Sequence, residues 1–150
     1  MTGRRLIYVC LALFFHFTAI LAAPGGQERR SAPDNLEQAR AYLRKSDYNH
    51  ALSILLRYIQ KEEHSKSVDT LNLMNAYYNV GGIYSVYSNF AQALDVYEKG
   101  YRLSLVSGNS GMQFKFLNNM IGAGCNIGNA AYAERLNEKV KELKGVPRGQ

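Results

Sequence analysis

The feature that most limits the fold is a long stretch without proline. Between Asp34 and Val146 the chain contains no proline, and its apolar residues recur every three or four positions rather than at alternate positions. Proline breaks helices, and a spacing of three to four residues places side chains on one face of a helix. The stretch is therefore predicted to be entirely helical, with no β-strand.

Six amphipathic segments divide this stretch. The first begins at Asp34, with Glu37 placed to complete a capping pair. The third is expected to open near Ser67, and the sixth to close at Gly145 in the position of a C-cap. The apolar residues that mark the last five segments lie in residues 48–59, 73–87, 90–101, 114–128 and 133–143.

The segments come in similar pairs. Ser46–Leu52 can be aligned with Ser88–Leu94 at an offset of 42, and the latter with Gly128–Ala133 at an offset of 40. In each copy a short polar turn precedes an alanine, which is small enough for two helices to approach closely. A period near 40 with two helices per unit is typical of a helical solenoid.

The middle unit carries a more specific pattern, with Tyr77, Val80, Gly81 and Tyr84 followed by Ala93 and Tyr97. It resembles the tetratricopeptide repeat (TPR), with tyrosine in place of the usual tryptophan and valine in place of leucine. The units are longer than the usual 34 residues, and the closing proline of the repeat is absent. The resemblance implies an all-α fold, a short α-solenoid of about three antiparallel helix pairs.

The resemblance also implies roles for individual residues. Those expected to pack the repeats are Tyr77, Val80, Gly81, Tyr84, Ala93, Tyr97, Ala51 and Ala133. Those expected to line a concave groove, which the first helix of each pair forms in the family, are Arg40, Arg44, Asn75, Tyr78, Asn79, Gly82, Ser85, Phe116, Asn119 and Asn126. An asparagine can hold a peptide backbone through its donor and its acceptor together. The same polar residues are equally well explained as a solvated face.

The N-terminal residues predict export. Arg4 and Arg5 precede the apolar run Leu6–Ala23, which ends before Pro24. This is the layout of a secretory signal peptide, and the run is also just long enough to be an uncleaved membrane anchor. The expected organisation is a signal or anchor at 1–23, a linker at 24–33, a helical repeat domain at 34–146 and a tail at 147–150. The protein is thus expected to be periplasmic or secreted, or membrane-anchored if the signal is retained.

The net charge of the chain argues against one class of partner, nucleic acid. Removal of Arg4 and Arg5 leaves 16 basic against 12 acidic residues, a net charge of +4. A weak charge without a basic cluster does not favour nucleic acid as a partner.

No combination of residues indicates catalysis or metal binding. Cys125 lies on the apolar spacing of residues 114–128 and is predicted to be a buried packing residue, with pairing to another chain as the alternative. His50 and His64 have no second histidine or cysteine at ligand spacing and are expected to be solvated. The glycines of residues 122–128 follow no strand, which favours helix packing over a phosphate loop. We expect no enzyme, no cofactor and no metal.

Six of the tyrosines fall between residues 77 and 101. Tyr77, Tyr84, Tyr97 and Tyr101 are expected in the core, because a tyrosine can bury its ring and hydrate its hydroxyl. Tyr78 lies off their apolar spacing, on the side that faces the groove in the family.

Three hypotheses follow for function. The first is a non-enzymatic module that binds a protein or peptide segment in the groove, similar to the TPR regions of exported bacterial envelope proteins. The second is a structural helical protein that self-associates, giving a homo-oligomer. The third is a sensor fragment of a membrane-bound regulator, which would need a partner chain or a further C-terminal part to supply an output.

Overall fold

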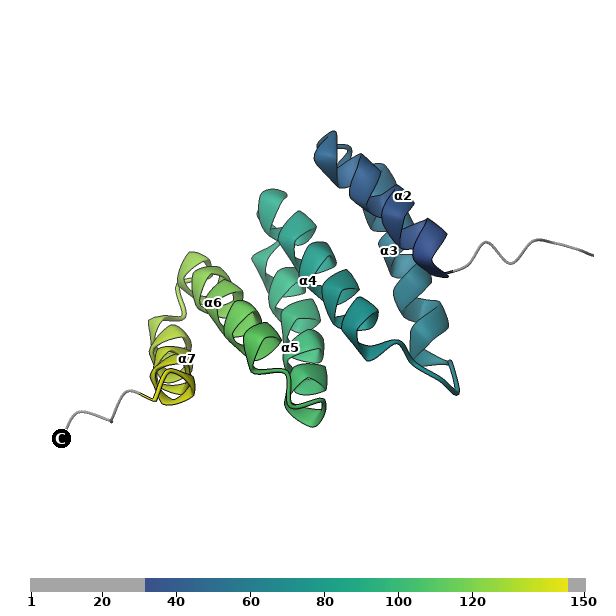
Figure 1. The fold of residues 1–150 in the computed structure, drawn as a ribbon. Helices are drawn as coiled ribbons and strands as arrows, with labels where there is room; N and C mark the ends of the chain where they lie inside the picture. The colour runs from purple at the N-terminus through teal and green to yellow at the C-terminus, as the bar shows by residue number, and fades with distance from the viewer. Residues whose placement is uncertain (1–31, 146–150) are drawn as a thin grey trace, which may run out of the picture. The chain divides into compact units, whose positions relative to one another are not determined.

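The computed structural model describes residues 32–145, and within them every regular element is an α-helix. In chain order the helices are α2 (Ala32–Arg44), α3 (Tyr48–Glu63), α4 (Thr70–Val86), α5 (Phe90–Val106), α6 (Ser110–Asn126) and α7 (Ala130–Leu143) (Figure 1). The prediction of an all-α fold without strands is confirmed for these residues. The predicted signal at 1–23 and the tail at 147–150 lie outside them.

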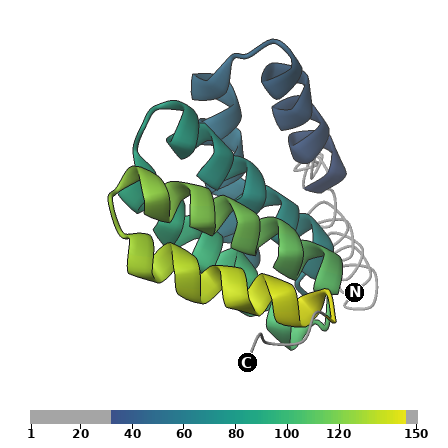
Figure 2. The same cartoon turned by 90° about the vertical axis from the view of Figure 1, so that its left-hand side faces the viewer.

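The helices pack in the order in which they occur. Each helix contacts the next one along the chain, and α4 also contacts α6 (Figures 1 and 2). The helices α4 and α5, which the sequence pairs, lie alongside each other. The result is a repeat-like arrangement in which a helix buries one face against its predecessor and another against its successor.

Four of the helix connections within residues 32–145 share one short form. Each ends a helix with a residue of positive φ, and the following Asp or Asn begins the next helix. The positive-φ residues are Ser46, Ser88, Gly108 and Gly128, at 58°, 59°, 67° and 76°. The N–H of the next residue donates to the carbonyl five positions back, as Asn129 does to Gly124 at 2.9 Å. This is the Schellman arrangement, and the side chains of Asp47, Asn109 and Asn129 then cap the new helix.

The connection between α3 and α4 is longer and corrects the expected start of the third helix. We predicted an opening near Ser67, but α4 begins at Thr70 with Asp69 as its N-cap. The Ser65 hydroxyl donates to the carbonyl of Ser67 at 2.9 Å, which holds a non-helical turn there. The N–H of Asp69 donates to the buried carboxylate of Glu62 at 3.2 Å. Side-chain hydrogen bonds therefore compete with the helix over these residues.

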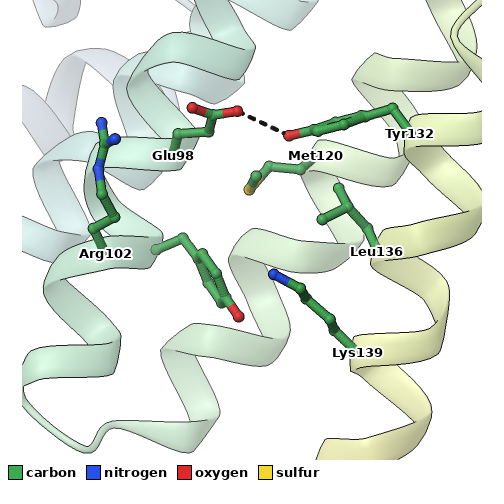
Figure 3. Close-up of a pocket in the computed structure, with 7 residues that line it drawn as sticks. Glu98, Arg102, Met120, Tyr132, Leu136 and Lys139 are labelled. Atoms are coloured by element: carbon green, nitrogen blue, oxygen red, sulfur yellow. Dashed lines mark hydrogen bonds between the residues drawn. The ribbon is translucent and has the colours of Figure 1, made fainter.

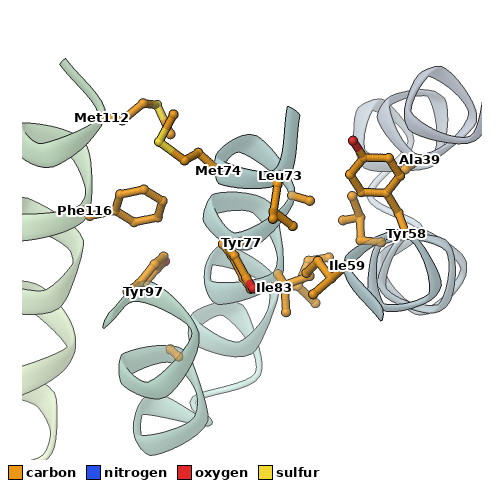
Figure 4. Close-up of a cluster of buried hydrophobic side chains, with 14 of the residues drawn as sticks. Ala39, Tyr58, Ile59, Leu73, Met74, Tyr77, Ile83, Tyr97, Met112 and Phe116 are labelled. Carbon is orange, nitrogen blue, oxygen red and sulfur yellow. The ribbon is translucent and has the colours of Figure 1, made fainter. Parts of the chain in front are cut away.

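Two glycines allow the central helices to approach closely. A Cβ on Gly81 of α4 would lie 2.3 Å from the ring of Tyr97 on α5, and a Cβ on Gly100 of α5 would lie 2.2 Å from the ring of Phe116 on α6. Tyr97 and Phe116 are 2% and 0% exposed, and their ring centroids are 6.4 Å apart (Figure 4). Tyr78 lies against both rings, with centroids at 6.5 and 6.0 Å. These contacts link α4, α5 and α6.

Most residues assigned to repeat packing lie in the core. Ala51, Tyr77, Val80, Gly81, Ala93, Tyr97 and Ala133 are buried. Tyr84 and Tyr101 are only partly buried, although both pack against the core. The remaining core positions of α4, which include Met74, Ala76 and Ile83, extend its buried face beyond the spacing on which the pattern rests.

The prediction that Cys125 is buried is wrong, because its side chain is exposed. The buried residues of α6 are Met112, Gln113, Phe116, Leu117, Met120, Ala123 and Gly124. This face is rotated from the predicted one because α6 packs against α5 on one side and α7 on the other. A Cβ on Gly124 would lie 2.9 Å from the ring of Tyr132 on α7, so the glycine belongs to the α6–α7 contact.

Two buried tyrosines differ in the hydrogen bonding of their hydroxyls. Tyr58 is 2% exposed (Figure 4), and its hydroxyl has no hydrogen-bond partner within the described residues 32–145. Burial, with the nearby carboxylates of Glu62 and Asp69, raises the pKa of Tyr58 to about 12. The Tyr77 hydroxyl instead donates to Glu63 Oε1 at 2.5 Å. That bond lowers the pKa of Glu63 and, after burial, helps to raise the pKa of Tyr77.

The glycine contact predicts opposite effects for one substitution at two sites. Gly81→Ala is expected to reduce the free energy of unfolding by about 1–2 kcal/mol, because overpacking outweighs the helix propensity gained. Gly122→Ala is the matched control, since a Cβ there meets nothing within 4 Å. It should stabilise the protein by roughly 0.5–1 kcal/mol. Urea unfolding followed by circular dichroism measures both, and equal effects would contradict the close contact.

The tyrosine hydroxyls give a second matched pair. Tyr58→Phe should raise the free energy of unfolding by about 1 kcal/mol, because it removes an unsatisfied buried hydroxyl, whereas Tyr77→Phe should lower it by a similar amount. An unfolded tyrosine loses its proton near pH 10, whereas folded Tyr58 keeps its proton until about pH 12. Because deprotonation favours the unfolded state between these two values, the free energy of unfolding falls as the pH rises from 10 to 12. Denaturant titrations at neutral and alkaline pH should therefore show a smaller alkaline loss for Tyr58→Phe than for the wild type. An unchanged alkaline loss would contradict the assignment.

Candidate functional site

A hollow of about 240 Å³ lies between α4 and α6 and reaches α5. Its lining residues carry neutral side chains; they are Ser85, Phe90, Tyr97, Asn118, Asn119, Gly122, Ala123 and Asn126. Ser85 comes from the last turn of α4 and Phe90 from the first turn of α5, while the asparagines come from the second half of α6. The contact between α4 and α6 brings these segments together.

Tyr97 connects the hollow to the core. Its buried ring lies against Gly81, and its hydroxyl is 3.4 Å from the Ser85 hydroxyl. Burial raises the pKa of Tyr97, and hydrogen bonding with Ser85 and Asn119 partly opposes that rise. The phenol therefore stays neutral near pH 7, with its hydroxyl among the polar groups of the lining.

Internal hydrogen bonds orient two of the polar side chains. The Ser85 hydroxyl donates to the Gly81 carbonyl at 3.0 Å, and the Asn126 amide donates to the Gly122 carbonyl at 2.8 Å. Both are bonds to a residue one turn earlier in the same helix. A hydroxyl keeps acceptor capacity after donating, and a primary amide keeps an oxygen and a second hydrogen. The hollow thus combines fixed neutral donors and acceptors with the apolar ring of Phe90.

The structure brings together three of the predicted groove residues: Ser85, Asn119 and Asn126 line the hollow. Asn75, Tyr78, Asn79 and Gly82 lie half-buried on α4 and are not among the lining residues. A Cβ on Gly82 would lie 3.9 Å from the Tyr97 hydroxyl, so its backbone is nevertheless close to the hollow.

Three other predicted groove residues are placed elsewhere. Phe116 is fully buried between Tyr97 and Tyr78 and presents no surface to a ligand. Arg40 and Arg44 are exposed on α2, where both pair with Glu37, at 3.5 and 3.1 Å. These pairs hold the two arginines on the surface of their own helix.

The sequence patterns did not indicate five of the lining residues, namely Phe90, Tyr97, Asn118, Gly122 and Ala123. A helical signal for part of this set was present, because Asn118, Gly122 and Asn126 follow one another at intervals of four residues. Tyr97 was assigned to packing alone, although its ring and its hydroxyl have separate neighbours.

Among the described residues that line the hollow, Tyr97 carries the ionisable side chain, and the others are neutral. Within residues 32–145 no three side chains of histidine, cysteine, aspartate or glutamate gather as a metal site. His50 Nδ1 lies 2.8 Å from the Asp47 carboxylate, and His64 Nδ1 lies 2.7 Å from the Gln60 carbonyl. The chemistry available in the hollow is hydrogen bonding and apolar contact.

Comparison with protein-family models and with curated proteins finds no match to the chain. Among the helices in the described part of the chain, none has the length and apolar character needed to cross a bilayer.

Two substitutions should differ in their effect on stability, because one residue lies in the core and the other lines the hollow. Phe116→Ala should lower the free energy of unfolding by about 3–5 kcal/mol, because it empties a fully buried site against Gly100. Asn126→Ala should change it by no more than about 0.5 kcal/mol, because the side chain is exposed. Thermal and urea unfolding of the two variants measure the difference. A small loss for Phe116→Ala would show that this ring is not a core residue.

Proposed function

We propose that the protein is a non-enzymatic, TPR-like interaction module that acts outside the cytoplasm and binds a peptide segment in the hollow between α4 and α6. The observation that carries this proposal is the lining, in which neutral hydroxyl and amide groups surround a tyrosine hydroxyl. Peptide groups are neutral and carry one donor and one acceptor each, so they match these side chains in kind.

The surroundings of the hollow support the same proposal. Val86 and Ile127 directly follow the lining residues Ser85 and Asn126 in the chain, and they are 56% and 46% exposed. Apolar side chains exposed at the ends of α4 and α6 suit a ligand that has both a backbone and side chains to bury. The extracytoplasmic location rests on the signal-like residues 1–23 and is part of the proposal.

Blocking the hollow tests the proposal. Gly122→Leu adds a large side chain to the lining of the hollow at a position where a Cβ meets nothing within 4 Å. Ser53→Leu adds the same side chain at an exposed position of α3 and is the control. Affinity capture from the exported fraction should recover a partner with wild type and Ser53→Leu, and at least about tenfold less with Gly122→Leu. Both variants should keep the helical circular-dichroism spectrum.

Equal capture by Gly122→Leu and Ser53→Leu would contradict the proposal. Sedimentation of the wild type tests the alternative of a self-associating protein. A concentration-dependent dimer that Gly122→Leu leaves intact, with no captured partner, would favour that alternative. Tyr78→Ser is unsuitable for this purpose, because the Tyr78 ring packs against Tyr97 and Phe116 and its loss would disturb the core.

A further inference from the structure

The helix α5 borders two other hollows, and Arg102 lines both of them. The first, of about 380 Å³, lies between α5 and the facing parts of α3 and α4, with Leu73, Tyr77, Leu103 and Val106 as its apolar lining. The second, of about 190 Å³, lies between α5, α6 and α7, with Met120, Tyr132 and Leu136 in its lining (Figure 3). Neither shares a lining residue with the neutral hollow between α4 and α6.

The two hollows are built alike. Each contains a glutamate whose carboxylate accepts a tyrosine hydroxyl: Glu63 from Tyr77 at 2.5 Å, and Glu98 from Tyr132 at 3.0 Å (Figure 3). The Glu63 carboxylate also pairs with Lys99 at 3.5 Å. Both acidic groups are therefore occupied by neighbours within the protein, and the Tyr77 bond holds the pKa of Glu63 below its usual range.

Besides Lys99, the cations Arg102 and Lys139 line these hollows. Arg102 is exposed, and within residues 32–145 the structure gives its guanidinium no hydrogen bond and no ion pair. Lys139 in the second hollow lies 5.8 Å from the centre of the Tyr101 ring. A guanidinium is charged at every physiological pH and presents a planar fork of donors that matches a carboxylate. Arg102 is thus an open anion-binding group between two apolar hollows.

Exposed apolar surface continues beside Arg102. Val106, one helical turn further along α5, is 88% exposed, and Leu105 is 49% exposed. Such side chains next to a cation favour a ligand that brings apolar groups and a negative charge together. A fatty acid or lipid carries its charge at one end, whereas Arg102 lies with an apolar hollow on either side. This order is the one found in a polypeptide with an acidic residue between two apolar ones.

We propose that the exposed face of α5 around Arg102 and Val106 binds a protein segment in which a carboxylate is flanked on both sides by apolar side chains. The carboxylate pairs with Arg102, and the flanking side chains enter the two hollows. This surface is separate from the hollow between α4 and α6. The proposal can therefore be tested independently of the function proposed above.

A peptide panel tests this proposal on the full chain. The probes are fluorescein-labelled peptides with a central glutamate, a leucine on either side and glycine–serine spacers of varied length, each with a glutamine counterpart. At least one spacing is expected to bind saturably in fluorescence polarisation. Its glutamine counterpart should bind about tenfold more weakly, because a charge-assisted pair is lost. Added salt should weaken the glutamate peptide more than the glutamine one.

Variants of the protein assign the binding to Arg102. Arg102→Gln should weaken the glutamate peptide by about the same factor and remove the difference between the two peptides. Arg57→Gln, at another exposed arginine, is the matched control and should bind like the wild type. Val106→Ser should weaken both peptides without loss of folding, because the valine is 88% exposed. Gly122→Leu should leave binding unchanged.

Several results would overturn the proposal. These are the absence of saturable binding by any peptide, equal losses in Arg102→Gln and Arg57→Gln, and loss of binding in Gly122→Leu. Self-association of the chain that Arg102→Gln abolishes would show a second copy as the occupant. Binding to phosphatidylserine vesicles that requires Arg102, without binding to any peptide, would assign the face to a membrane surface.

Discussion

The described structure depends on the contact between a helical glycine and an aromatic ring of the following helix. Gly81 admits Tyr97, and Gly100 admits Phe116, at positions where any Cβ would overlap the ring. Each contact removes a large apolar surface from water while bringing two helices closer than side chains on both would permit. Because α5 supplies the ring of one contact and the glycine of the other, it holds α4 and α6 in place. Tyr78 completes the cluster from α4.

The two candidate binding surfaces both follow from the position of α5. On one side the Tyr97 hydroxyl, fixed by the packing of its ring, lies among the neutral side chains of the hollow between α4 and α6. On the other, Arg102 lies between two apolar hollows whose glutamates accept tyrosine hydroxyls. One face offers partners for a peptide backbone, and the other offers a charge between apolar pockets. The proposals for the two faces therefore concern different ligand chemistry on one helix.

Much of the architecture was predictable because its causes are local. The helices between residues 32 and 145 follow from apolar spacing and the absence of proline, and their ends follow from short turns of Ser or Gly before Asp or Asn. The candidate site was predictable only in part. Ser85, Asn119 and Asn126 line the hollow, but Phe116 is buried and Cys125 is exposed. The helix α6 has apolar residues on much of its circumference. The spacing of these residues alone therefore does not determine which face of α6 is buried.

By itself, the sequence determined the type of each element, its approximate ends and the pairing of similar units, because these depend on residues a few positions apart. Only the tertiary structure decided which face of α6 is buried, which asparagines lie near the Tyr97 hydroxyl and which arginine lines two hollows at once. Those outcomes depend on how residues of different helices meet, and a small rotation of one helix exchanges buried side chains for exposed ones. The Gly100–Phe116 contact shows this, since neither residue lies near the other in sequence and neither was predicted to meet the other.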